Sequence, residues 1–182
     1  MIFGTDQIDF LRGGTGNDYV SGGAKSDVYS YALGDGRDIL AEDSPWGRSL
    51  FTFMTPSTDP DFLIFGDDIA AEDVKYLRWG NDLEIRIGTG LDNIVVRDHF
   101  DYQAPLLLFP ETWDGQIEAI KFSNGYSDLA ADIREEIIAR AQTDGDDWIE
   151  GFGIGGETYR GGKGNDFIST AGGSDTIHFA RG

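Results

Sequence analysis

Aspartates recur at a spacing of nine residues near the start of the chain, each inside a glycine-rich unit. The units run in register over residues 4–12, 13–21 and 22–30. Their sixth positions are Asp9, Asp18 and Asp27. Carboxylate oxygens, together with backbone carbonyls of such turns, are the hard ligands that Ca²⁺ prefers over zinc or copper. The residue types and spacing therefore predict calcium chemistry.

The same units contain the elements that would position these carboxylates. The first six residues of each are small, polar and glycine-rich, which favours a turn. The eighth residue is apolar or aromatic (Leu11, Val20, Tyr29), as expected for a short strand with one inward side chain. Acidic disorder would have no reason to keep this eighth position. The period predicts a parallel β-roll in which turns eighteen residues apart stack on one side.

A second block of units begins at residue 142. Its units are residues 142–150, 151–160, 161–169 and 170–178. The sixth positions are Asp147, Asp166 and Asp175, and the eighth are Ile149, Ile168 and Ile177. The ten-residue unit 151–160 has Gly156 where aspartate is expected, and the neighbouring Glu157 is the candidate substitute. We expect a second roll here.

These units resemble the RTX (repeats-in-toxin, haemolysin-type) calcium-binding family. The resemblance implies that each Ca²⁺ ion lies between two turns that are two repeats apart. The first turn would supply the carbonyls of positions two and four and its sixth-position aspartate. The second turn would supply the carbonyls of positions one and three and its own sixth-position aspartate. One site would then use Thr5, Gln7 and Asp9 with Gly22, Ala24 and Asp27. The next would use Gly14, Gly16 and Asp18 with Leu33, Asp35 and Asp38. A third would use Thr143, Gly145 and Asp147 with Gly161, Lys163 and Asp166.

The family resemblance thus implies about three Ca²⁺ ions. A fourth site, with Thr170, Gly172 and Asp175, stays open because its facing unit has Gly156 at the sixth position. The unit 33–41 comes two residues late, after a longer strand, and is similar to the family's usual exit from a roll.

Between the repeat blocks the period vanishes and strand patterns replace it. Short segments rich in β-branched and aromatic residues are 61–65, 74–79, 82–87, 93–98 and 117–122. They resemble the module found beside RTX repeats. Residues 127–141 carry a helical pattern, with a Glu136–Arg140 pair one turn apart.

We therefore expect an all-β fold, in which two short parallel β-rolls of nonapeptide repeats flank an antiparallel β module, with one α-helix. The predicted divisions are an N-terminal calcium-binding roll (1–43), the module (44–126), a connecting helix (127–141) and a truncated C-terminal calcium-binding roll (142–182).

Composition narrows the classes of function. With 14 Lys and Arg against 33 Asp and Glu, the net charge is −19, which argues against nucleic acid and anionic membranes. There is no cysteine, so disulfides and thiolate metal sites are excluded. No apolar run approaches a membrane span, and no signal peptide is recognisable. We expect a piece of a larger parent chain. The resemblance implies type I secretion from a Gram-negative bacterium and an extracellular location.

Two alternatives remain beside a calcium-binding folding module. Aromatic loops carrying Trp46 and Trp113 could bind glycans, as in an accessory domain of a secreted enzyme or adhesin. The Asp59-Pro60 bond could be cleaved by the chain itself when calcium binds, as the resemblance to self-cleaving modules suggests. The histidines, His99 and His178, have no cysteine or second histidine beside them, and no Ser-His-Asp order or nucleophile elbow appears, so we expect no enzyme active site.

Overall fold

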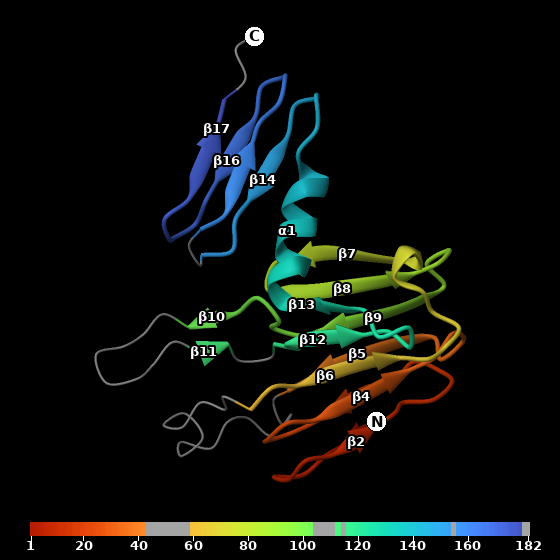
Figure 1. Ribbon diagram of the computed structural model, residues 1–182. Coiled ribbons are helices and arrows are strands. Elements are labelled where there is room, and N and C mark those ends of the chain that lie inside the picture. Colours follow the sequence, from red (N-terminus) through yellow and green to blue (C-terminus); the bar gives the residue numbers. More distant parts are fainter. Residues whose placement is uncertain (43–58, 104–111, 114–115, 154–155, 180–182) are drawn as a thin grey trace, which may run out of the picture. The chain divides into compact units, whose positions relative to one another are not determined.

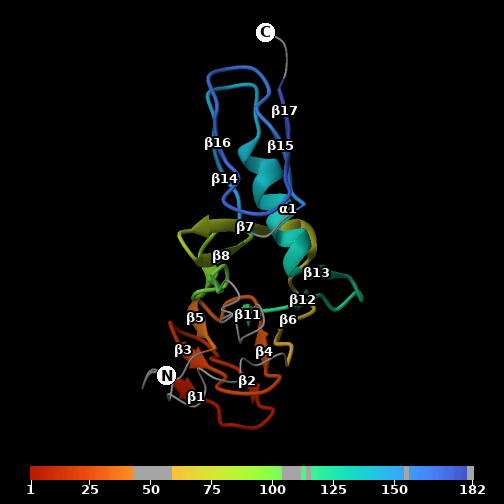
Figure 2. The ribbon, with the colours of Figure 1, turned by 90° about the vertical axis from the view of Figure 1, so that its left-hand side faces the viewer.

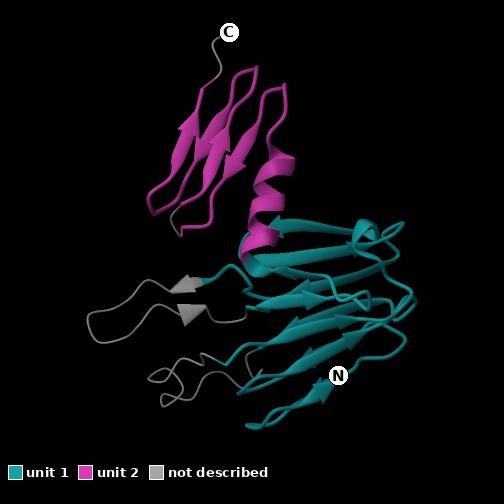
Figure 3. Cartoon of the chain, viewed as in Figure 1, with its two compact units in different colours: residues 1–130 teal, residues 131–182 magenta. Residues whose placement is uncertain are grey.

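The computed structural model describes residues 1–42, 59–103, 112–113, 116–153 and 156–179. The chain divides into two compact units, residues 1–130 and 131–182, which are described one at a time (Figure 3).

The first unit begins as a parallel roll (Figure 1). Its strands are β1 (Ile2–Phe3), β2 (Phe10–Leu11), β3 (Tyr19–Ser21), β4 (Val28–Tyr31), β5 (Arg37–Ala41) and β6 (Phe62–Phe65). Odd-numbered strands pair in parallel on one side and even-numbered strands on the other (Figure 2). Val20, Tyr29, Leu40 and Leu63 are buried between the two sides. The eighth-position residue points inward, as the period predicts.

An antiparallel meander extends the odd-numbered sheet. It consists of β7 (Val74–Trp79), preceded by a short 3-10 helix (Ala71–Asp73), then β8 (Asp82–Ile87) and β9 (Asp92–Val96). Parallel pairing of β9 with β5 joins it to the roll, so the sheet order is β1-β3-β5-β9-β8-β7. On β8, Leu83, Ile85 and Ile87 share a buried face, while on the other face Arg86 is exposed and Glu84 is buried.

The even-numbered sheet gains two further strands. β12 (Ala119–Lys121) pairs in parallel with β6, and β13 (Ser127–Leu129) pairs antiparallel with β12, which gives the order β13-β12-β6-β4-β2. The small pair β10 (Tyr102–Gln103) and β11 (Thr112–Trp113) stands apart from both sheets. Ile117 and Ile120 are fully buried and extend the core that Leu63 and Ile94 begin.

The helix α1 (Ala130–Ala141) starts later than the sequence pattern predicts. Residues 127–129 instead form β13, where Asp128 lies opposite Ile120. The Asp128 carboxylate accepts hydrogen bonds from the hydroxyls of Tyr76 and Tyr126, and these bonds favour the strand over a first helical turn. The predicted ion pair is present, with Arg140 Nη2 2.8 Å from Glu136 Oε1.

The second unit contains the C-terminal roll. Its strands are β14 (Trp148–Glu150), β15 (Thr158–Arg160), β16 (Phe167–Ser169) and β17 (Thr176–His178). β14 pairs in parallel with β16, and β15 with β17. Ile149 and Tyr159 are fully buried. Over the described residues the structure is mostly β with one α-helix, and it has both parallel and antiparallel sheets, as predicted. No helix in the described part of the chain is long and apolar enough to cross a membrane.

Candidate calcium sites

The sixth-position carboxylates stack on successive coils and are linked by one repeated hydrogen bond. In each link, the backbone N–H of one acidic residue donates to the carboxylate of the acidic residue that lies next on the same side. The links are Asp9 to Asp27 (2.8 Å), Asp18 to Asp38 (2.9 Å), Asp27 to Asp61 (2.6 Å), Asp61 to Glu118 (2.5 Å), Asp147 to Asp166 (3.1 Å) and Glu157 to Asp175 (3.2 Å). We call these rows the carboxylate ladders.

At the first predicted site, the turn that holds Asp9 lies against the turn that holds Asp27. Asp9 Oδ2 accepts hydrogen bonds from the backbone N–H and hydroxyl of Thr5, at 2.6 and 2.8 Å. The Thr5 carbonyl accepts from the Ala24 N–H at 3.1 Å, which brings the two turns together. The Gln7 N–H bonds to Thr5 Oγ1. Gly22 opens the second turn directly beside Asp27.

At the second predicted site, Asp18 and Asp38 come together as expected. The Gly16 N–H donates to the Asp35 carbonyl at 2.7 Å, which brings that carbonyl to the facing turn. The Asp35 side chain is engaged elsewhere, because Arg12 pairs with it at 3.1 Å. Gly14 adopts a left-handed φ of +79°, as the turn requires. Leu33 is half exposed, and its N–H is bonded to Asp68.

The third predicted site repeats the first one closely. Thr143 donates to Asp147 through its N–H and its hydroxyl, both at 2.6 Å. The carboxylate of Asp166 lies over Gly161 and receives the Asp147 N–H. The Lys163 ammonium pairs with Asp144 at 2.9 Å, and both side chains are exposed. Gly145 stands in the turn of Asp147, as the sequence predicts.

The open fourth site has Glu157, not Gly156, opposite Asp175. The Tyr159 hydroxyl donates to Glu157 Oε2 at 2.5 Å, while Glu157 Oε1 is buried without a hydrogen-bond partner. Burial raises the pKa of Glu157. The facing residues Thr170 and Gly172 lie close to Gly151 and Gly153 respectively. Glu157 therefore occupies the stacking place that the sequence left undecided.

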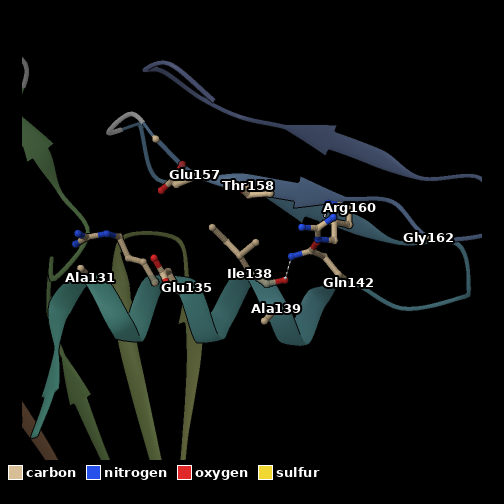
Figure 4. Close-up of a pocket in the computed structure, with 11 residues that line it drawn as sticks. Ala131, Glu135, Ile138, Ala139, Gln142, Glu157, Thr158, Arg160 and Gly162 are labelled. Carbon is tan, nitrogen blue, oxygen red and sulfur yellow. Dashed lines mark hydrogen bonds between the residues drawn. The ribbon is translucent and has the colours of Figure 1, made fainter. Parts of the chain in front are cut away.

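Glu157 also borders a groove inside the second unit (Figure 4). The groove has a volume of about 700 Å³ and runs between α1 and β15. Figure 4 shows Glu157 and Arg160 on the strand side, with Ile138 and Gln142 on the helix side. Gln142 Oε1 accepts the Arg160 N–H at 2.6 Å and ties the helix end to the strand.

Glycines make room for the stacked carboxylates. A Cβ on Gly161 would lie 2.5 Å from Asp166 Oδ2, and a Cβ on Gly22 would collide with Asp27 Oδ2 and the Tyr29 hydroxyl. Lys25, which departs from the repeat motif, adopts a φ of +77°, a conformation that normally favours glycine. A substitution at a unit's first glycine would therefore push a carboxylate out of its place.

In the first unit, three ladder carboxylates are buried: Asp27, Asp38 and Asp61. Burial raises the pKa of Asp27 to about 6, and the nearby charges of Asp61 and Asp9 add to this effect. Burial, together with the Asp18 charge, also raises the pKa of Asp38. Carboxylate and carbonyl oxygens are the ligands that Ca²⁺ prefers. A bound calcium ion would offset the repulsion between the stacked carboxylates.

The sequence analysis did not identify Asp61 and Glu118, which the fold adds to these ladders, or Glu42, which lies beside Asp27 and Asp61. Asp61 precedes β6 and continues the ladder after Asp27. A signal for it existed, because Leu63 follows two residues later, as the eighth position follows the sixth. Glu118 then continues from Asp61, and burial raises its pKa to about 7. The same spacing is present there, because the buried Ile120 follows Glu118 by two residues.

The alternatives are less visible in the structure. Trp46 and the side chain of Trp113 lie outside the described residues, so glycan binding through them stays a prediction. Asp59 is described, and its carboxylate pairs with Lys25 at 3.2 Å. Self-cleavage at Asp59-Pro60 stays a prediction.

Comparison with known protein families identifies the repeats and the segment between them. Residues 3–40 and 153–182 match the RTX calcium-binding nonapeptide repeat, and residues 82–127 match the haemolysin-type calcium binding protein related domain. The chain is thus an RTX calcium-binding repeat protein, with a haemolysin-type related domain between its two repeat blocks. The predicted resemblance is confirmed.

Two further comparisons add less. No curated protein matches the chain. Among solved structures, it is similar to the extracellular lipase LipA from Serratia marcescens, at 16% identity and a TM-score of 0.42. The match covers 96% of this chain and 28% of the lipase chain.

Proposed function

We propose that this chain is the calcium-dependent folding module of a larger secreted protein and is not itself an enzyme. The observation that supports this most directly is the pair of carboxylate ladders in the first unit, repeated in the second. Each brings acidic side chains from successive coils to one gap. About three Ca²⁺ ions would bind at the Asp9–Asp27, Asp18–Asp38 and Asp147–Asp166 links, with Glu157–Asp175 as a fourth.

Calcium would act on folding through charge and chain entropy. Without the ion, stacked carboxylates repel one another, and glycine-rich turns lose much backbone freedom when they order. Extracellular calcium modules bind with Kd of about 10⁻⁴–10⁻³ M, so cytosolic calcium would leave such sites empty. At calcium about tenfold above Kd, each site would add ~1.4 kcal/mol, and three would add ~4 kcal/mol. That sum is comparable with the stability of a small domain.

This mechanism fits export in an unfolded state followed by folding outside the cell. The type I secretion machinery would handle the parent chain, whose activity is supplied by parts beyond this segment. The ions, the rest of the parent chain and the exporter are the partners we propose.

A circular dichroism titration of the full chain tests the proposal. We expect a cooperative gain of β signal at sub-millimolar to millimolar Ca²⁺ and none with Mg²⁺. Asp18→Ala and Asp166→Ala should each raise the calcium midpoint, because each removes one carboxylate from a ladder. Asp67→Ala, at an exposed position outside the ladders, is the matched control. A chain fully folded in chelator, with unchanged midpoints in both variants, would contradict the proposal.

A further inference from the structure

Three buried carboxylate groups converge inside the first unit at one end of the roll. Asp27 precedes β4, Glu42 follows β5 and Asp61 precedes β6. One oxygen from each lies within 4.8 Å of the other two. Asp27 is fully buried, Asp61 is 8% exposed, and the Glu42 Oε1 atom is buried. We call this group the Glu42 cluster.

Strand register explains how Glu42 comes to this place. Phe3, Ser21 and Ala41 are aligned across β1, β3 and β5. The residues that follow them are Gly4, Gly22 and Glu42, so Glu42 stands where the two preceding coils have glycine. A Cβ on Gly22 would point into the space of Asp27 Oδ2. A glutamate one coil later carries a carboxylate into the equivalent space.

A fourth side chain points independently to a missing ligand. Tyr29 is 1% exposed, and its hydroxyl lies beside Asp27 Oδ2 over Gly22, close enough to interact with Glu42 but without a well-formed hydrogen bond. Tyr159 holds the matching eighth position of the second unit, but its hydroxyl donates to Glu157. Asp27 Oδ2 and Glu42 Oε1 are also without partners. Buried polar groups in folded proteins are almost always hydrogen-bonded, so three without a well-formed hydrogen bond at one point indicate an absent partner.

Among the residues that the structure describes, no positive side chain compensates the charge of the Glu42 cluster. No Lys or Arg of these residues pairs with any of its three carboxylates. Burial, followed by the Asp61 charge, raises the pKa of Glu42 well above its usual value, and burial also raises the pKa of Asp61. Such a group is relieved either by protons or by a bound cation.

We propose that Asp27, Glu42, Asp61 and the Tyr29 hydroxyl bind one Ca²⁺ ion inside the N-terminal roll, with the Glu42 side chain as a ligand that the repeat motif does not supply. This inference rests on the proposed function. Oδ1 of Asp27 and Oδ1 of Asp61 already accept ladder hydrogen bonds, so the three carboxylates offer four further oxygens and the Tyr29 hydroxyl a fifth. Water or backbone carbonyls would complete the six to eight oxygen ligands of Ca²⁺. Mg²⁺ keeps several waters and needs near-octahedral geometry, so a buried cluster favours calcium. Asp27 Oδ1 remains bonded to the Asp9 N–H, so the new site uses its other oxygen.

Calcium counting on the full chain tests this site. Equilibrium dialysis with atomic emission should find one ion fewer per chain in Glu42→Gln than in the wild type. Glu72→Gln, an exposed glutamate of the 3-10 helix, is the matched control and should bind the wild-type number. Tyr29→Phe should keep that number but weaken one site by about threefold to tenfold, as expected for the loss of one neutral polar contact.

Stability measurements give a second test, because Glu42→Gln should change stability in opposite directions without and with calcium. In chelator, Glu42→Gln should show more β signal than the wild type, because one repelling charge is gone. In saturating calcium, it should unfold at lower urea than the wild type, because one ion is lost. A cluster relieved by protons alone would leave Glu42→Gln at least as stable in both conditions, and this result would overturn the proposal.

The remaining outcomes separate this inference from the proposed function. A wild-type chain that binds no calcium contradicts both. Calcium binding that is sensitive to Asp18→Ala, with equal ion counts in the wild type and Glu42→Gln, contradicts this site only. If Glu42→Gln stays unfolded in calcium, the calcium affinities of Tyr29→Phe test the proposal instead. Wild-type affinity at every site of Tyr29→Phe would refute it.

Discussion

The first glycine of a repeat unit has no Cβ, and this leaves room for the carboxylate of the unit's aspartate. In the second unit, Gly161 lies under Asp166, whose Oδ1 receives the Asp147 N–H. A side chain at Gly161 would meet Asp166 Oδ2 before anything else. The aspartate would rotate away, because its flexible end yields more easily than the backbone. The glycine thereby sets the direction of a carboxylate and, through it, the affinity for calcium.

Gly161→Ala should therefore raise the calcium concentration at the folding midpoint by about tenfold. This corresponds to the loss of the ~1.4 kcal/mol that one bound calcium ion contributes to folding. Ser169→Ala is the control, because it stands in the same roll at an exposed position of β16 and outside the predicted sites. Circular dichroism titrations of the two variants compare them directly. Equal midpoints would show that Asp166 tolerates the added methyl group.

Among the elements, β8 holds the antiparallel meander together. It pairs with both β7 and β9, and Ile85 at its centre is completely buried. On its other face, Glu84 bonds to Arg86, Trp79 and Asn93, and these bonds lower the pKa of Glu84, with Arg86 as the main cause. The strand thus combines a packed face and a satisfied polar face.

Ile85→Ala should lower the free energy of unfolding by about 2–5 kcal/mol, because it leaves a cavity in a closed core. Urea denaturation in saturating calcium measures the change. Lys75→Ala, an exposed substitution on the neighbouring strand, should stay within about 0.5 kcal/mol of the wild type. A small effect at Ile85 would mean that the core collapses around the gap.

The sequence predicted these elements where a short period governs them. The alternation in β8 and the nine-residue units each place side chains through local geometry, so β7 and β8 appear with their observed bounds. Asp61 escaped detection because 34 residues separate it from its ladder neighbour Asp27, in place of eighteen. Glu118 is 57 residues from Asp61 and reaches it only through the pairing of β12 with β6. Such contacts follow from tertiary pairing, which no local pattern encodes.

The first residue of α1 also depends on a contact between residues far apart in the sequence. The helical spacing of apolar residues runs back to Leu129, yet Leu129 is exposed and lies in β13. Hydrogen bonds to Asp128 from Tyr76, more than fifty residues earlier in the chain, decide between strand and helix. Periodicity predicted the helix, but a distant partner determined its first residue.

At the scale of the whole molecule, buried acids make the ion-free chain sensitive to pH. The pKa of Asp27 rises from 3.8 to about 6, and that of Glu118 from 4.5 to about 7, mainly through burial. An acid whose pKa rises on folding favours the fold fully below its unfolded pKa. That contribution is lost as the pH rises through the folded pKa. Between about pH 4 and pH 7, the stability of the ion-free fold should therefore fall with rising pH.

In chelator, lowering the pH from about 7.5 to about 5 should accordingly increase the β signal in circular dichroism. Glu118→Gln should flatten part of this pH response, because it removes one of the titrating groups. Glu72→Gln should leave the response unchanged. A β signal that falls on acidification without calcium would show that these carboxylates are ionised and favourably solvated in the fold.

The carboxylate ladders have a direction. In every link, the N–H belongs to the residue earlier in the chain and the accepting carboxylate to the later one. A coil is thus complete only when its successor is in place, and the template for each coil lies on its C-terminal side. A chain that leaves a pore with its C-terminal end first always adds a new coil to a finished one. In the reverse order, every newly emerged coil would wait with an unpaired N–H for the next.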